Sequence, residues 1–81
     1  PVCGYPGLDE PAWVDDAPSY EICPCCGTEF GYQDVGHEAE ARAARHRELR
    51  QEWIELGCPW WSNREPPPGW DPKAQLRNVD P

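Results

Sequence analysis

Five cysteines carry the clearest chemical signal in this chain. Three stand in the run Cys23-Pro24-Cys25-Cys26-Gly27, a complete Cys-Pro-x-Cys-Gly pattern, and Cys3-Gly4 is the back half of the same pattern. Such a turn, here called a knuckle, can aim two thiolates at one ion, and a tetrahedral zinc shell then needs a second knuckle. Nineteen residues separate Cys3 from Cys23, an ordinary loop between knuckles. The sequence therefore predicts one metal site with Cys3, Cys23 and Cys26 as ligands.

The fourth ligand is expected to be a cysteine before Pro1, because the chain begins inside the first knuckle. Cys58 and His37 are the alternatives within the chain. Cys25 lies between the two ligands of the second knuckle and is expected to point away from the metal. Zinc is the expected ion and iron the alternative, since thiolates bind both.

The charge of the chain is strongly acidic and unevenly distributed. The net charge is -8, and there is no Lys or Arg before Arg42. Such a surface repels phosphate backbones and anionic membranes, so we expect neither nucleic acid nor a membrane as partner. A protein partner is expected instead, and a basic one would be attracted over long range. Close cysteine spacing without a secretory signal indicates a reducing, cytoplasmic setting.

The chain is short enough for one domain, over residues 1–81, and is expected to need a metal as a staple. Residues 1–34 are interpreted as a knuckle unit, in which residues 19–22 and 28–32 form the strands of a β-hairpin around the second knuckle. Between the knuckles lies an acidic loop. Gly27 is expected to supply the backbone freedom that the turn needs.

One long helix is predicted over residues 37–56. Gly57 suits its C-terminal cap, and Leu49, Trp53 and Leu56 share one face, which His46 extends backwards. The first half of the helix is almost entirely Ala and charged residues, so its packing face there is thin.

Residues 57–81 form an irregular tail rich in Pro and Trp. Asp71-Pro72 predicts an N-cap and first turn of a short terminal helix through residues 73–77, anchored by Leu76. Successive side chains of an extended segment point to opposite faces, so Trp60 and Trp61 cannot both be buried easily. One of them is expected to bind a partner.

Two families share these features. The knuckles resemble those of rubredoxins and zinc ribbons. The ordered set of Cys23-Pro24-Cys25-Cys26, Phe30-Gly31-Tyr32 and the later tryptophans resembles the bacterial cysteine-rich CPCC family more closely, over most of the chain. That resemblance implies a zinc-ribbon-like domain and little about its role. With the helix and tail read from the residues, the expected fold is a small α+β metal-stapled domain with zinc-ribbon-like or rubredoxin-like β-hairpin knuckles, one long helix and an irregular Pro- and Trp-rich tail.

Three functions are open on these observations. The first is a non-enzymatic protein with a structural zinc, which binds a partner and could act as an inhibitor or immunity protein. The second is an iron electron carrier of the rubredoxin kind. The third is a thiol–disulfide redox protein, although the sequence after Gly27 indicates a strand rather than the helix that such chemistry favours.

Overall fold

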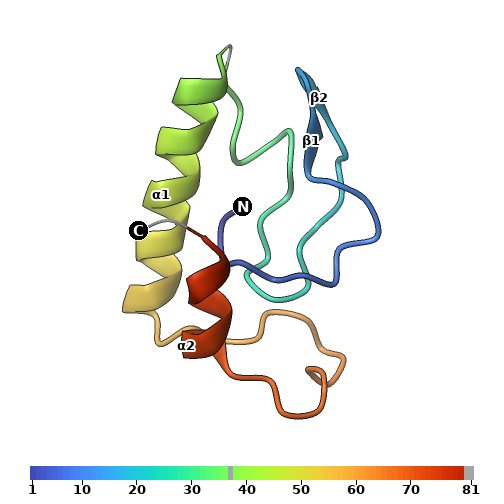
Figure 1. Ribbon diagram of the computed structural model, residues 1–81, viewed down its shortest axis with the longest axis vertical. Helices are drawn as coiled ribbons and strands as arrows, with labels where there is room; N and C mark the ends of the chain where they lie inside the picture. Colours follow the sequence, from blue (N-terminus) through green and yellow to red (C-terminus); the bar gives the residue numbers. More distant parts are fainter. Residues whose placement is uncertain (37, 80–81) are drawn as a thin grey trace.

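A computed structural model of the chain describes residues 1–36 and 38–79. It has a small α+β fold with five elements, namely β1 (Trp13–Val14), β2 (Ala17–Pro18), α1 (Ala39–Glu55), α2 (Pro72–Gln75) and the 3-10 helix η1 (Leu76–Asn78). Helix α1 runs along one side of the molecule, the β1–β2 hairpin lies opposite its first half, and the tail with α2 packs near its other end (Figure 1). His37, one of the two alternatives for the fourth metal ligand, lies outside the described residues.

The β-hairpin lies in the acidic loop between the knuckles, where no strand was predicted. Trp13 pairs with Pro18 and Val14 with Ala17 in antiparallel register. Asp15 adopts the left-handed conformation in the turn, with φ 54°, which Asp tolerates better than most residues. Each strand has two residues, too few for an alternating pattern to be recognised.

The hairpin predicted around the second knuckle is reduced to one antiparallel bridge, between Ile22 and Glu29. Tyr20 has a left-handed backbone, with φ 62°, which interrupts an extended strand before Ile22. After Glu29 the chain turns at once, because Tyr32 and Gln33 both donate their amides to the Glu29 carbonyl. The prediction of strands at 19–22 and 28–32 was therefore wrong, although the segments on either side of the second knuckle do pair at this one bridge.

Helix α1 begins two residues after the predicted start, with Glu38 as N-cap, and ends one residue early. Gly57 follows with φ 93°, as expected for the cap. Leu49 and Trp53 are buried, but Leu56 is 76% exposed, so its assignment to the packing face was wrong. The residue that caps a helix turns away from the periodicity of its interior, and Leu56 is that residue here.

The first half of α1 packs through polar side chains. Arg42 and His46 are buried there. The Arg42 guanidinium lies 4.3 Å from the Trp13 ring centre and donates to the Asp15 carbonyl and to the Asp16 carboxylate, both at 3.2 Å. Arg42 thereby joins α1 to the hairpin, where the sequence suggested only a thin packing face.

One apolar core draws on the knuckles, the helix and the loop between them. Its buried members are Val2, Cys3, Ala12, Cys23, Cys25, Phe30, Leu49 and Trp53. Tail residues Trp60, Trp70 and Leu76 pack against it while partly exposed. In α2 and η1 the buried residue is Gln75 rather than the predicted anchor Leu76. The Asp71 cap is confirmed, since its carboxylate accepts the Lys73 amide at 3.0 Å.

Candidate metal centre

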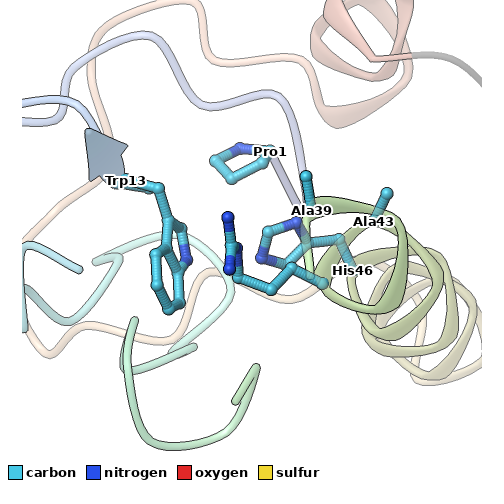
Figure 2. A pocket seen from close by; sticks show the side chains of 7 residues that line it. Pro1, Trp13, Ala39, Ala43 and His46 are labelled. Carbon is cyan, nitrogen blue, oxygen red and sulfur yellow. The ribbon is translucent and has the colours of Figure 1, made fainter. Parts of the chain in front are cut away.

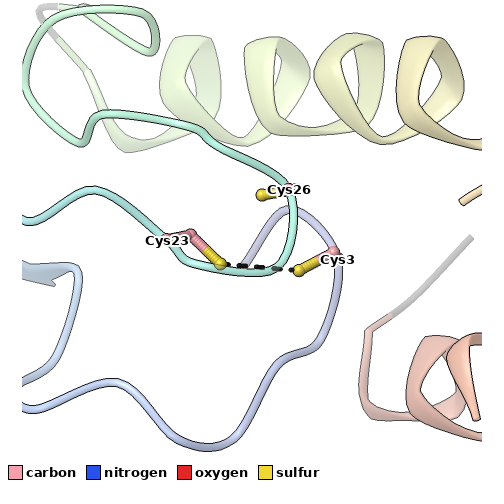
Figure 3. A group of neighbouring side chains, drawn as sticks. All are labelled: Cys3, Cys23 and Cys26. Carbon is pink, nitrogen blue, oxygen red and sulfur yellow. Dashed lines mark hydrogen bonds between the residues drawn. The ribbon is translucent and has the colours of Figure 1, made fainter. Parts of the chain in front are cut away.

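Three cysteine sulfurs from distant parts of the chain meet in one cluster. The Sγ atoms of Cys3, Cys23 and Cys26 all lie within 4.8 Å of one another, and those of Cys3 and Cys23 are 3.7 Å apart (Figure 3). Zn–S bonds of about 2.3 Å at tetrahedral angles place sulfurs about 3.8 Å apart. All five cysteines are free thiols. The cluster therefore has the donor type and the spacing of a metal site, and it unites the three cysteines that the sequence selected.

The second knuckle is fixed by its own backbone. The Gly27 amide donates to the Cys23 carbonyl at 2.8 Å, and the Cys23 amide donates to the Thr28 carbonyl at 2.9 Å. Gly27 has φ 77°, and a Cβ at this position would overlap the indole of Trp61. Two independent features therefore favour glycine at position 27, namely the left-handed backbone and the neighbouring indole ring.

The first knuckle is held from outside, by α1 and by the tail. Arg50 donates to the carbonyls of Pro1 and Val2, at 2.7 Å in each case. Gln75 donates to the Cys3 carbonyl at 3.0 Å, and Asn78 donates to the Gly4 carbonyl at 3.0 Å. These bonds place Cys3 opposite the second knuckle although no secondary structure links the two.

Cys25 lies outside the three-sulfur cluster. Its side chain is fully buried, and its Sγ accepts a hydrogen bond of 3.2 Å from Gln75. Gln75 thus contacts both knuckles, and the sequence did not single it out. A polar residue in a short helix gives no periodic signal, so no sequence pattern indicated this role.

The thiols of the cluster influence one another strongly. Hydrogen bonding with Cys23, and to a smaller extent with Cys3, lowers the pKa of Cys26 to about 3. Hydrogen bonding with Cys26 raises the pKa of Cys23 to about 12. Hydrogen bonding to Cys23, followed by that to Cys25, raises the pKa of Cys3. Three thiolates cannot share this small volume without a compensating positive charge. A divalent cation would supply that charge, and its binding would release the remaining protons.

Cys58, the alternative fourth ligand that the structure describes, does not join the cluster. Cys58 follows the α1 cap, is partly buried against the core, and is absent from the three-sulfur group that the described residues form. The expected cysteine before Pro1 stays a prediction.

The two adjacent tryptophans differ as the sequence predicted. Trp60 is partly buried in edge-to-face contact with Tyr5 and Trp70, at ring-centre distances of 5.5 and 5.3 Å. Trp61 is 58% exposed and covers Gly27, while its amide donates to the Cys25 carbonyl at 2.9 Å. Trp61 is thus the exposed indole, and it adjoins the second knuckle.

A second polar centre lies between α1 and the hairpin. The Asp34 carboxylate is fully buried and accepts from Trp13 Nε1 at 2.7 Å, from the Gly31 amide at 2.6 Å and from His46 Nε2 at 2.6 Å. Burial raises the pKa of Asp34, but these hydrogen bonds outweigh it and the net effect lowers the pKa. Burial lowers the pKa of His46 more than Asp34 raises it, and the ring contributes Nε2 to the carboxylate.

A pocket of about 360 Å³ borders this centre. Trp13 faces the side of α1 that carries Ala39, Ala43 and His46, with Pro1 at the rim (Figure 2). The buried carboxylate has all its bonds within the protein, which suits a structural role that ties the hairpin to the helix.

The fold and the cluster together define a small α+β protein with a three-thiolate site suited to a metal ion. A Bacillus subtilis (strain 168) protein, named Uncharacterized protein YoaQ, is 33% identical to this chain over 67 residues. The match covers 69% of this chain and 56% of that protein, so the chain spans little more than half of the relative's length. No family model matches the chain, and no solved structure matches it. Neither described α-helix has the length and apolar composition needed to cross a bilayer.

Proposed function

We propose that this chain is a small zinc-binding protein in which the metal is structural and the surface binds another protein. Metal binding is supported by one observation: three cysteine sulfurs from the two knuckles lie within 4.8 Å of one another. Cys3, Cys23 and Cys26 would hold the ion, and a bound Zn²⁺ would supply a cross-link between the two knuckles.

Burial of two of the three cysteines, with Cys26 partly exposed, favours a structural rather than a catalytic metal. Cys3 and Cys23 are each only 2% exposed, and both lie in the apolar core. A catalytic zinc keeps an open position for water or substrate, whereas a structural zinc is enclosed by protein ligands. The chain is also small enough for such a cross-link to matter greatly to its stability.

Charge and aromatic exposure support the interaction role. The net charge of -8 would speed association with a basic partner, and the exposed Trp61 offers a large apolar contact. An inhibitor or immunity protein is one role of this type. Membership in the bacterial cysteine-rich CPCC family is likewise proposed, on the motifs around the second knuckle.

Elemental analysis of protein purified from cells tests the metal. We expect close to one zinc per chain and little iron, and Cys26→Ser should lose most of the metal. Cys58→Ser is the matched control and should retain it, because Cys58 lies outside the cluster. One iron per chain would support an electron carrier instead, and full metal content in Cys26→Ser would refute the proposed site.

The interaction surface is tested by comparing two tryptophan variants. Trp61→Ala should retain most of the stability and lose binding to proteins captured from the native host, while Trp60→Ala should unfold more easily because it breaks the Tyr5–Trp60–Trp70 contacts. Equal destabilisation by both variants, with capture unchanged, would contradict the assignment of Trp61 to a partner.

A further inference from the structure

The three cysteines of the cluster are not equally accessible to solvent. Cys3 and Cys23 are each 2% exposed and belong to the apolar core, whereas Cys26 is partly exposed. A small oxidant dissolved in water therefore reaches Cys26 before it reaches the other two. Hydroperoxides are oxidants of this kind, and they react with accessible thiolates.

A second thiol lies close enough to Cys26 to complete such an oxidation. The sulfurs of Cys3, Cys23 and Cys26 all lie within 4.8 Å of one another, and all three are free thiols (Figure 3). A disulfide brings two sulfurs to about 2 Å, so a short movement of the side chains is enough to join a pair. The cluster thus combines one partly exposed thiol with two buried thiols that could attack its oxidised form.

Cys23 is the better placed of these two thiols. It lies three positions before Cys26, so a bond between them closes a very short loop at little cost in chain entropy. Cys3 belongs to the other knuckle, and Gln75 holds its carbonyl at 3.0 Å. A Cys23–Cys26 disulfide changes one turn alone, whereas a bond to Cys3 involves two segments that are fixed separately.

Trp61 connects this turn to the proposed partner surface. Its amide donates to the Cys25 carbonyl at 2.9 Å, and its indole lies against Gly27, where a Cβ would overlap the ring. Both contacts are to residues of the turn that the disulfide would reshape. Because Trp61 is 58% exposed, a change in this turn also changes the surface.

Building on the structural metal and the partner surface proposed above, we propose that the second knuckle is a peroxide-sensitive switch. Oxidation joins Cys23 to Cys26, removes two of the three metal ligands and moves Trp61. The metal is released because thiolates bind zinc and a disulfide has none to offer. A thiol reductant restores both thiolates and with them the site.

The oxidation takes place in two steps. The Cys26 thiolate attacks one oxygen of hydrogen peroxide: an S–O bond forms, the O–O bond breaks, and the leaving hydroxide takes a proton to become water. The Cys23 thiolate then attacks the Cys26 sulfur: the S–S bond forms, the S–O bond breaks, and a second hydroxide leaves as water. The two thiolates lose two electrons, one peroxide molecule gains them, and solvent supplies two protons.

The test treats zinc-loaded protein with hydrogen peroxide and follows zinc release with a chromogenic indicator. Free thiols are then alkylated, and the chain is cleaved after glutamate, which leaves the second knuckle in residues 22–29 and Cys3 in another peptide. We expect zinc release in step with an internal disulfide in peptide 22–29, and reversal of both by dithiothreitol. Zinc retained through oxidation, or a disulfide between the two peptides, would overturn the proposal.

Two serine variants identify the thiols of the switch. Cys25→Ser should still form the disulfide, because Cys25 lies outside the cluster, and Cys25→Ala serves the same purpose where serine is not tolerated. Cys58→Ser is the matched control, since Cys58 is a partly exposed thiol away from the knuckle, and it should release zinc at the wild-type rate. A disulfide lost on substitution of Cys25, or slower release from Cys58→Ser, would refute the pairing.

Indole N–H signals in NMR spectra follow the effect on the surface. Oxidation should shift the Trp61 signal and leave the Trp13 signal in place, because Trp13 Nε1 is held by Asp34 at 2.7 Å. An unmoved Trp61 signal, or movement of all indole signals to unfolded positions, would overturn the switch.

Failure of the metal site gives a different result from failure of the switch. Zinc-loaded protein that forms no disulfide refutes the switch alone. Protein that carries no zinc refutes the structural metal, and the disulfide map then still decides whether Cys23 and Cys26 are the redox pair.

Discussion

Substitution of Gln75 should loosen the whole molecule, although this residue lies in a helix of four residues. Its side chain is 7% exposed and makes three hydrogen bonds. It donates to the Cys3 carbonyl at 3.0 Å and to Cys25 Sγ at 3.2 Å, and it accepts from Trp70 Nε1 at 2.9 Å. Gln75→Ala would leave all three partners without this bond.

The expected loss follows from these three bonds. A typical hydrogen bond contributes about 1 kcal/mol net to stability, so their removal should lower the free energy of unfolding by about 3 kcal/mol. In a domain of this size each kcal/mol shifts the melting temperature by about 4–8 °C, so a decrease of about 12–24 °C is expected. That is a large share of the stability of a small domain.

Thermal and urea unfolding, followed by circular dichroism at a fixed concentration of free zinc, measure this loss. The metal concentration must be fixed because a ligand that binds only the folded state shifts the apparent stability. Gln75→Met should lose almost as much as Gln75→Ala, because it restores volume but no hydrogen bonds. Gln51→Ala is the matched control, since Gln51 is exposed and makes only a long bond of 3.4 Å to Glu55, and it should change stability by less than about 0.5 kcal/mol. A stable Gln75→Met variant, within error of the wild type, would refute the reasoning.

Two further outcomes are expected. The pKa values of His46 and Asp34 are both lowered by folding, so their contribution to stability is present at neutral pH and is lost on acidification, below about pH 6.5 for His46 and below about pH 4 for Asp34. Denaturation measured from pH 7 to 5 at fixed free zinc should therefore show a steeper fall for the wild type than for His46→Gln, and parallel curves would contradict this assignment. Gly27→Ala should destabilise the protein more than Gly57→Ala. Both positions have positive φ, but only at Gly27 would the new methyl group meet the Trp61 ring. Equal melting temperatures of the two variants would show that the indole moves aside at little cost.

Local chemistry made the cysteine cluster and the helix ends predictable from the sequence. The spacing of Cys23 and Cys26 fixes a turn by itself, and Gly57 and Asp71 act on backbone groups within a few residues. Such features depend on interactions close in sequence, so their residue types are informative without knowledge of the fold.

The hydrogen bonds that position the first knuckle join residues far apart in the sequence. The bond from Gln75 to Cys3 joins residues 72 positions apart, and the bonds from Arg50 to residues 1 and 2 span 49 and 48 positions. Nothing in the sequence distinguishes Asp34 from the other acids, yet its carboxylate lies fully buried among three donors. Charged and amide side chains have no periodicity that distinguishes a buried, bonded residue from an exposed one, so the sequence did not indicate these roles.

The same long-range bonds connect the proposed metal site to the proposed binding surface. Trp60 and Trp70 contact each other, Trp70 is held by Gln75, and Gln75 holds Cys3 of the first knuckle. The second knuckle holds the start of the tail, because the Trp61 and Ser62 amides donate to the carbonyls of Cys25 and Pro24. A metal that joins the knuckles would therefore also fix the Trp60–Trp70 contact and the exposed Trp61, and removal of the metal should weaken partner binding at Trp61 without any change to that residue.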